Sequence, residues 1–244
     1  YDTADRLYFE PLNAESVIEI FNKENSNGKV LGVYVQFGGQ TPLKIAKQLE
    51  DAGIRILGTS TKAIDLAEDR DLFSGTLKKL DIQQPKNGIS NNIEEVIKIA
   101  NRIGYPVLIR PSYVLGGRAM EIAYDDKNLE KFAYKAMEVS TNNTLLIDQY
   151  LENAIEIDID LIRDKEGNVF VAGIMEHIEE AGIHSGDSAC SLPPFSINNE
   201  IQEKIIDWVK KIANEINVVG LMNTQVALKK NELFVLEVNQ RASR

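Results

Sequence analysis

The sequence is poor in the residues that build disulfides and common metal sites, with one cysteine and two histidines in 244 residues. A single cysteine cannot form an internal disulfide, so we expect a reducing, cytoplasmic environment. No apolar run approaches the roughly 18 residues of a membrane span, and no signal peptide is visible. The G-x-G-x-x-G pattern is absent as well. These absences argue against a disulfide scaffold, a membrane protein and a dinucleotide-binding fold.

Acidic residues outnumber basic ones by 37 to 27, which gives a formal net charge of -10. A nucleic-acid-binding surface needs a dense basic footprint, so we expect no nucleic-acid partner. A small anionic ligand is compatible with this balance, because a few arginines and backbone N–H groups can be concentrated in one place. A phosphate site in such a chain would need a divalent cation as well.

The length and the ends of the chain predict a fragment that holds one large domain or two smaller ones. The chain begins with Tyr1 rather than methionine, and it stops at Arg244, directly after a strand-like segment, residues 233–239. Domains rarely end straight after a central strand. We therefore interpret the chain as part of a longer polypeptide.

The first sixty residues alternate helical and strand patterns, which predicts a βαβ unit with parallel strands. Helices are expected at residues 14–25 and 42–53, and buried strands at residues 30–37 and 54–59. The two glycines that follow the first strand, residues 38–39, are interpreted as a tight turn.

The remaining residues predict an α+β region in which antiparallel strands alternate with helices. Helical patterns cover residues 60–80, 92–104, 127–140 and 200–216, and strand patterns cover residues 106–110, 119–124, 144–151, 154–164, 168–179 and 223–239. In the last helix we expect Asn199 as the N-cap and Trp208 in the core. The apolar stripe of that helix is Ile201, Ile205, Val209, Ile212 and Ile216.

Residues 110–118, RPSYVLGGR, join two predicted strands and could contact a phosphate group. Gly116 and Gly117 would let the backbone come close to a ligand, while Arg110 and Arg118 would neutralise phosphate charge. The segment is not a Walker loop, because no Gly-Lys-Ser/Thr follows. From these residues alone, a flap over a triphosphate and a plain hairpin loop with solvated arginines both stay open.

Glu156, Asp158 and Asp160 alternate with apolar residues, so they share one face of a strand. Three carboxylates in a row repel one another, so arginines, a metal ion or the hydroxyls of a ligand should compensate them. The alternative is a strand whose polar face lies in water.

Gln225, Glu237 and Asn239 lie in the last predicted hairpin and could form a cluster of hard oxygen ligands. Glu237 and Asn239 share a face, whereas Gln225 joins them only if the turn, residues 229–231, has three residues. Such ligands suit Mg²⁺ or Mn²⁺, particularly when substrate phosphates complete the coordination. Two arginines follow at once, so cation and anion sites would be adjacent. A polar hairpin end without a metal is the alternative.

Both histidines and the only cysteine lie within residues 176–191, EHIEEAGIHSGDSACS. The spacing of His177, His184 and Cys190 matches no common structural zinc site. Ser185 is the fourth residue of GIHSG, which does not fit the G-x-S-x-G elbow of a serine hydrolase. We expect Cys190 to be a small buried residue. A glycine-containing turn with His184 and Ser185 as donors would suit a nucleotide.

Six segments resemble the large subunit of carbamoyl phosphate synthetase (also called synthase), a member of the ATP-grasp superfamily. They follow the family order along the whole chain: YDTADRLYFEP, QFGGQTPLKIA, AEDRDLF, RPSYVLGGRAME, EHIEEAGIHSGDSACSLPP and EVNQRASR. RPSYVLGG and GDSACSLPP are similar to the second of that subunit's two halves, which phosphorylates carbamate, whereas the first half phosphorylates bicarbonate.

The resemblance implies a pre-ATP-grasp (Rossmann-like) domain at residues 1–60, N-terminally incomplete, and an ATP-grasp domain at residues 61–244, C-terminally truncated. The expected fold class is therefore α/β and α+β. The implied reaction is ATP-dependent phosphorylation of carbamate to carbamoyl phosphate, which feeds arginine and pyrimidine biosynthesis. The implied ligands are ATP, carbamate and Mg²⁺ or Mn²⁺. A glutaminase small subunit and an oligomeric parent enzyme are also implied.

The resemblance also implies roles for individual residues. Nucleotide phosphates would be contacted by Arg70 and Arg110 and covered by a flap at Gly116 and Gly117. The adenosine pocket would contain Gln149, Leu151 and Glu156, with Glu156 on the ribose hydroxyls, and also Gly182, Ile183, His184 and Ser185. The divalent metals would be held by Gln225, Glu237 and Asn239, of which the first two also contact ATP. The catalytic arginines would be Arg110, Arg241 and Arg244, the last two stabilising the transferring phosphoryl group or the carbamate.

Two positions depart from the family pattern. Gln240 stands where proline is usual before Arg241, and proline would fix the backbone at that point. Gln149 stands where His or Glu is more usual. The alternatives that stay open are another ATP-grasp ligase, such as a biotin carboxylase relative, a nucleotide-binding fragment without turnover, and a scaffold without a ligand.

Overall fold

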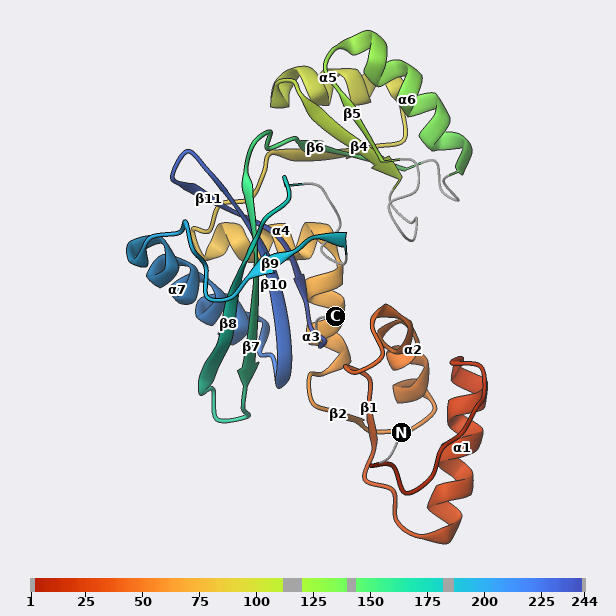
Figure 1. Ribbon diagram of the computed structural model, residues 1–244. Coiled ribbons are helices and arrows are strands. Elements are labelled where there is room, and N and C mark those ends of the chain that lie inside the picture. The colour runs from red at the N-terminus through yellow and green to blue at the C-terminus, as the bar shows by residue number, and fades with distance from the viewer. Residues whose placement is uncertain (1–2, 112–119, 140–143, 182–186, 243–244) are drawn as a thin grey trace.

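The computed structural model describes residues 3–111, 120–139, 144–181 and 187–242. Figure 1 shows three parts in a row: an N-terminal part with a short sheet, a central sheet with its helices, and a smaller lobe. No helix in these four stretches is long and apolar enough to cross a bilayer.

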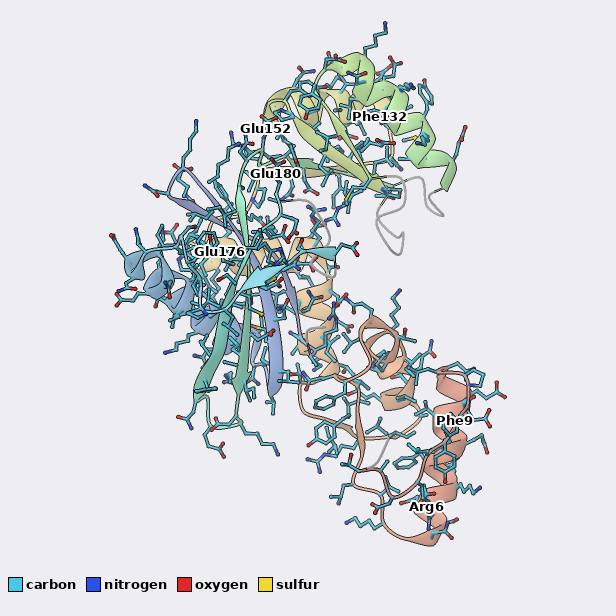
Figure 2. The ribbon with its side chains drawn as sticks, in the orientation of Figure 1. Arg6, Phe9, Phe132, Glu152, Glu176 and Glu180 are labelled. Atoms are coloured by element: carbon cyan, nitrogen blue, oxygen red, sulfur yellow. The ribbon has the colours of Figure 1, made fainter. Side chains whose placement is uncertain are left out.

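The N-terminal part contains α1 (Ala14–Asn27), β1 (Val33–Tyr34), α2 (Gln40–Asp51) and β2 (Ile56–Leu57). β1 and β2 pair in parallel, which confirms the predicted βαβ unit. Both strands are shorter than the predicted runs, because in the described part of the chain each pairs only with the other. The helices and strands enclose a small core around Val35, Leu43 and Leu49. In Figure 2, Arg6 and Phe9 lie beside α1.

Two helices, α3 (Thr61–Glu68) and α4 (Arg70–Lys79), connect this part to the rest of the molecule. The sequence pattern predicted one helix, and the structure divides it at Asp69. The Asp69 backbone is extended, and its side chain accepts a hydrogen bond from the N–H of Leu72 at 2.9 Å. Asp69 therefore ends one helix and caps the next.

The smaller lobe is a four-stranded antiparallel sheet covered by two helices. Its elements are β3 (Asn87–Ser90), α5 (Ile93–Ile103), β4 (Val107–Pro111), β5 (Glu121–Ala123), α6 (Asp126–Val139) and β6 (Leu145–Gln149). The strand order is β3-β6-β4-β5. The apolar residues of the sheet and both helices form one core, with Phe132 packed against it (Figure 2). β3 was not predicted, because a four-residue strand that contains Asn and Gly has no clear apolar alternation.

The central sheet has five antiparallel strands in the order β11-β10-β7-β8-β9. Its elements are β7 (Ile155–Arg163), β8 (Val169–His177), β9 (Cys190–Ser191), α7 (Asn199–Ile216), β10 (Gly220–Lys229) and β11 (Glu232–Asn239). The predicted stripe of α7 packs against the sheet, and Trp208 joins this core as expected. The N-cap is Asn198, one residue before the predicted Asn199, and it accepts from the N–H of Ile201 at 2.9 Å.

The two faces of the central sheet differ in polarity. Ile157, Ile159 and Leu161 of β7 lie in the same core as α7, together with residues of α3 and α4. The residues between them on β7 therefore face the other way. Ile64 of α3 packs into the N-terminal core, while the neighbouring Ala63 packs into the central core. The predicted domain boundary after residue 60 stays a prediction, since α3 contributes to both cores.

Candidate functional site

The face of the central sheet opposite α7 has polar residues on three neighbouring strands. In β11, β10 and β7, directly paired residues form two rows, Asn239–Asn223–Asp160 and Glu237–Gln225–Asp158. Paired residues in an antiparallel sheet point to the same side. The sheet thus brings Gln225, Glu237 and Asn239 together on one face.

The hairpin between β10 and β11 places Gln225 on this face by a route that the sequence did not predict. Its turn has two residues, Lys230 and Asn231, with positive φ angles of 50° and 67°, as a type I′ turn requires. If the two strands paired without a bulge, this two-residue turn would place Gln225 and Glu237 on opposite faces of the sheet. A β-bulge at Leu236 shifts the register by one residue, so Gln225 pairs with Glu237. The three-residue turn that was thought necessary does not occur.

Protein groups contact the carboxylates of Asp158 and Asp160 in β7. His177 Nε2 lies 2.7 Å from Asp158 Oδ2. The Asn223 carboxamide donates to Asp158 Oδ1 at 3.1 Å and to Asp160 Oδ1 at 2.9 Å. Glu156 and Asp158 are only 6% and 7% exposed, so the alternative of a water-facing strand is wrong. An imidazole and a carboxamide contact these two aspartates.

The histidine-containing segment places side chains on both faces of the sheet. Glu176 faces α7, where it is 1% exposed and accepts from the N–H groups of Phe195 and Ser196, each at 2.9 Å (Figure 2). Cys190 is exposed, so the expectation that it is buried is wrong. Partial burial and the Asp158 carboxylate raise the pKa of the Cys190 thiol, which disfavours the thiolate that a nucleophile needs.

The oxygen atoms of Gln225, Glu237 and Asn239 fit a hard divalent cation. Asn239 Nδ2 donates to Glu237 Oε1 at 2.9 Å, so these two side chains are in contact. In the four described stretches no group of three or more His, Cys, Asp or Glu side chains could hold a metal ion. The set has one carboxylate and two carboxamides, so a cation here would need further oxygens. This donor chemistry fits a metal–nucleotide complex better than a cage made of protein groups alone.

Two further polar residues approach this set from outside the sheet, and sequence reasoning missed both. Gln40, at the start of α2, donates from Nε2 to Asn239 Oδ1 at 3.3 Å and to Glu68 Oε1 at 3.4 Å. Burial, and after it the negative charge of Glu237, raises the pKa of the Glu68 carboxyl. α3 and the N-terminal part therefore add groups to the site.

Arg70 of α4 and Arg110 of β4 meet at one carboxylate, that of Asp148 in β6. Arg70 Nη2 donates to Asp148 Oδ1, and Arg110 Nε lies 3.4 Å from Asp148 Oδ2 without hydrogen-bond geometry. Among the described residues, Arg70 Nη1 and Arg110 Nε are buried without a hydrogen-bond partner. Burial and, to a smaller extent, the Arg110 cation lower the pKa of Arg70, although Asp148 opposes this shift. Two cations that share one carboxylate could bind a further anion.

We expect Asp148→Asn to lower the stability of the ligand-free chain by about 1–3 kcal/mol, because two guanidinium groups would face each other without a carboxylate. An anion that binds there would relieve this repulsion, so Mg-ATP should raise the Tm of the variant more than that of the wild type. Thermal melts with and without Mg-ATP measure both effects, with Asp207→Asn on the surface of α7 as the control. Equal ligand-induced shifts in all three proteins would contradict an anion site at Arg70 and Arg110.

An apolar cluster lies where β6 leads into β7, beside the polar face. Its members are the buried Leu151, Ala154 and Ala227 and the partly buried Ala181 and Phe234. Glu156 pairs with Ala227 across the strands, so it borders this cluster. Leu151 and Glu156 were predicted for an adenosine pocket, whereas Ala227 and Phe234 were missed. Figure 2 shows Glu152 and Glu180 near this junction.

Gln149 ends β6 and holds the strand to the linker before β3. Its backbone N–H donates to the Lys86 carbonyl at 2.8 Å, and its carboxamide oxygen accepts from the Lys86 N–H at 3.3 Å. The carboxamide oxygen therefore has a backbone partner already. The predicted contact of Gln149 with a nucleotide base stays a prediction.

Arg241 follows β11 and has a buried nitrogen, Nε, without a hydrogen-bond partner, while Nη1 donates to the Ala242 carbonyl at 3.2 Å. Gln240, which stands where a proline was expected, is 1% exposed and donates from Nε2 to the Ala63 carbonyl at 2.7 Å. A hydrogen bond thus anchors the backbone next to Arg241 at the position where a proline ring would restrict it.

Family comparisons cover the whole chain. A model described as the carbamoyl-phosphate synthase L chain, ATP binding domain, matches residues 69–244. A second model, the carbamoyl phosphate synthase preATP-grasp domain, matches residues 1–66. The chain belongs to the carbamoyl phosphate synthase large-chain family.

Individual relatives support this assignment. The carbamoyl phosphate synthase large chain of Archaeoglobus fulgidus is 56% identical over 244 residues, which are 100% of this chain and 22% of that protein. The large chain of Xanthomonas axonopodis pv. citri is 53% identical over 249 residues, 100% of this chain and 23% of that protein. The chain therefore spans less than a quarter of the length of these curated relatives.

Solved structures show the same fold at low sequence identity. A biotin carboxylase complex with β,γ-ATP from Campylobacter jejuni has a TM-score of 0.76 and 20% identity, and the match covers 95% of this chain and 52% of that one. The biotin carboxylase domain of Hydrogenobacter thermophilus 2-oxoglutarate carboxylase has a TM-score of 0.77 and 23% identity, and the match covers 99% and 55%. The predicted fold class, a pre-ATP-grasp unit followed by an ATP-grasp fold, is confirmed.

Several residues that the carbamoyl phosphate synthase resemblance selected lie outside the described residues. They are Gly116, Gly117, Gly182, Ile183, His184, Ser185 and Arg244. A hollow of about 510 Å³, lined by Ser74, Gln84, Lys86 and Arg102 among others, does not coincide with the polar face. It contains two basic side chains and no carboxylate, so it offers a divalent cation fewer ligands than the polar face does.

Proposed function

We propose that this chain forms the ATP site that phosphorylates carbamate in a carbamoyl phosphate synthase large chain. The observation that carries the proposal is the presence of two kinds of group in the described residues: hard oxygen donors at Gln225, Glu237 and Asn239, and guanidinium groups with buried, unpartnered nitrogens at Arg70, Arg110 and Arg241. A nucleoside triphosphate with a divalent cation needs both kinds of group. The family assignment points to the same ligand.

Binding of the nucleotide would use the apolar cluster and the residues around it. Leu151, Ala227 and Phe234 offer apolar surface to a base, and Glu156 at the border of the cluster would accept hydrogen bonds from ribose hydroxyls. Arg70 and Arg110 would then bind phosphate oxygens through the nitrogens that have no partner. The flap glycines, Gly116 and Gly117, and the segment Gly182–Ser185 would complete the contacts with ATP.

The metal ligands would be Gln225, Glu237 and Asn239. Mg²⁺ or Mn²⁺ bound there would neutralise phosphate charge and orient the γ-phosphoryl group. Among the chain's own residues, Asn239 holds the Glu237 carboxylate by its hydrogen bond. Contacts with His177 and Asn223 hold the Asp158 side chain, and Asp158 pairs with Gln225 in the sheet.

The chemistry would be an in-line displacement at the γ-phosphorus. A carbamate oxygen forms a bond to phosphorus while the bond to the leaving ADP oxygen breaks, which gives carbamoyl phosphate and ADP. The protein would position the reactants and stabilise charge, since phosphoryl transfer needs little covalent help. Arg241 and Arg244 would stabilise the transferring phosphoryl group or the carbamate. Arg110 would be the third catalytic arginine and would contact the nucleotide phosphates.

The choice of the carbamate half rests on RPSYVLGG and GDSACSLPP, which resemble the second half of the family's large chain. We propose the same domain limits as before, residues 1–60 and 61–244. An oligomer with a glutaminase subunit, in arginine and pyrimidine biosynthesis, would supply the biological setting. A different ATP-grasp ligase is the second candidate, because biotin carboxylases share the fold.

The experiment that tests the proposal is ATP formation from Mg-ADP and carbamoyl phosphate. This back-reaction needs neither ammonia, bicarbonate nor a glutaminase. We expect ATP to form with carbamoyl phosphate and not with acetyl phosphate, and Mn²⁺ to replace Mg²⁺. ATP binding without any phosphoryl exchange would overturn the proposal in favour of a chain that binds nucleotide without turnover. Transfer from another acyl phosphate would favour a different ligase.

A further inference from the structure

The loop between β1 and α2, QFGGQ (Gln36–Gln40), contacts the far end of the chain. Gln36 is 2% exposed, and its Nε2 lies 2.9 Å from the Gln240 carbonyl and 3.2 Å from the Leu221 carbonyl. Its backbone carbonyl accepts from the N–H of Ala242 at 2.9 Å. Gln36 thus holds the backbone on both sides of residue 241.

Glycines on two other segments leave the space that this carboxamide occupies. A Cβ atom at Gly58 would lie 2.7 Å from Gln36 Oε1, and one at Gly220 would lie 2.6 Å from it. Both glycines have positive φ, +85° and +108°, which L-residues with a side chain rarely adopt. Thr59 follows Gly58, and its Oγ1 donates to the Val219 carbonyl at 3.0 Å, which joins the segments that carry the two glycines. The carboxamide of Gln36 is therefore enclosed by backbone from three segments.

Gln40 at the other end of the loop contacts the proposed metal ligands. Its Nε2 donates to Asn239 Oδ1 at 3.3 Å and to Glu68 Oε1 at 3.4 Å. Asn239 in turn donates to Glu237 at 2.9 Å. One loop of the N-terminal part therefore contacts residue 239 through a side chain and residues 240 and 242 through Gln36.

We infer that the loop Gln36–Gln40 is a positioning element for phosphoryl transfer, in which Gln40 orients Asn239 and Gln36 fixes the backbone that presents Arg241. This inference rests on the proposed function and adds the N-terminal part to the reaction. A misplacement of reacting groups by about 1 Å costs on the order of 100-fold in rate. Small shifts of this loop should therefore reach the reaction without any contact between the loop and the substrate.

The test is Gln40→Leu, with Gln48→Leu as the matched control. Gln48 lies on the same helix and is exposed, so the two changes are chemically identical. We expect Gln40→Leu to lower kcat of the back-reaction roughly 10- to 100-fold and to raise the Mg²⁺ concentration for half-maximal rate. KM for ADP and the Tm should stay close to wild type, because Gln40 belongs to no apolar core. Gln48→Leu should change none of these.

A merely structural loop would give a different pattern, with a lower Tm and an unchanged kcat and Mg²⁺ requirement in Gln40→Leu. That pattern would overturn the inference. Gln36→Leu offers a second measurement that does not depend on turnover. We expect faster exchange of the Ala242 amide hydrogen in this variant, with the Ile201 amide of α7 unchanged. An unchanged Ala242 amide would overturn the role of Gln36.

The proposed function and this inference fail in distinguishable ways. A wild-type chain that makes no ATP from carbamoyl phosphate counts against the proposed function alone. In that case calorimetry with ADP over a range of Mg²⁺ concentrations tests the loop: Gln40→Leu should need more Mg²⁺ than wild type to change the ADP affinity, and should keep the metal-free affinity. Equal Mg²⁺ effects in wild type and Gln40→Leu, including no effect in either, would overturn the role of Gln40.

Discussion

Glu237→Ala should abolish ATP formation from Mg-ADP and carbamoyl phosphate, with a loss of roughly 10³-fold or more. Glu237 is the only carboxylate among the three proposed metal ligands, and Gln225 and Asn239 lie next to it across and along the hairpin. A bound divalent cation contributes several kcal/mol to transition-state stabilisation, and each 1.36 kcal/mol corresponds to a factor of ten. Initial rates over a range of Mg²⁺ concentrations measure the loss.

The fold should survive this substitution, because Glu237 is exposed and its charge already acts unfavourably on Glu68. The Tm of Glu237→Ala should therefore equal or exceed that of the wild type. Glu232→Ala is the matched control, since Glu232 is exposed on the same strand and lies at the turn, away from the polar rows. Near-normal turnover of Glu237→Ala would show that Glu237 is not a metal ligand.

Periodicity in the sequence predicted the elements whose stability comes from a single apolar face. The stripe of α7 and the alternation of β7 are examples, because each places its apolar residues on one face that packs in the core. The break between α3 and α4 was missed, since the charged residues around Asp69, residues 68–71, can also belong to one continuous helix. Short elements such as β3 carry too few residues for a period to be visible.

The candidate site was predictable only in part, because sequence spacing does not show bulges or long-range contacts. Glu237 and Asn239 share a strand and needed only the alternation rule, whereas Gln225 depends on the bulge at Leu236. Gln40 and Glu68 belong to helices of the N-terminal region and meet Asn239 and Glu237 only in the folded chain. The family resemblance selected residues through motifs, and these two contacts lie outside the roles it implied.

Gln240 shows how hydrogen bonds can anchor the backbone at a position where the family pattern has proline. Proline at this position would restrict the backbone before Arg241. Here the Gln240 side chain donates to the Ala63 carbonyl, and its own carbonyl accepts from Gln36. The two hydrogen bonds anchor the same backbone, so the placement of Arg241 does not depend on proline. The buried Gln240 Oε1 has no partner, which identifies a cost of this arrangement.

Arg241→Met should reduce kcat of the back-reaction by about 10³- to 10⁵-fold, the range that arginines contribute when they stabilise a transferring phosphoryl group. In the described part of the chain, Nε of Arg241 is buried without a partner, while Nη1 donates to the Ala242 carbonyl. A group left unpaired in the ligand-free chain can gain a hydrogen bond when negative charge develops on phosphoryl oxygens. Methionine keeps most of the side-chain volume and removes this donor.

The affinity for Mg-ADP separates this role from nucleotide binding. If Arg241 acts on the transferring group, its guanidinium stabilises the transition state and contributes little to binding in the ground state. Arg241→Met should then leave the Kd for Mg-ADP within about threefold of wild type while kcat falls. Arg55→Met is the control, because Arg55 is an exposed arginine directly before β2. A variant that loses Mg-ADP affinity and kcat equally would place Arg241 at the bound phosphates instead. Of the three proposed catalytic arginines, Arg110 would then be the one described residue left for the transferring group.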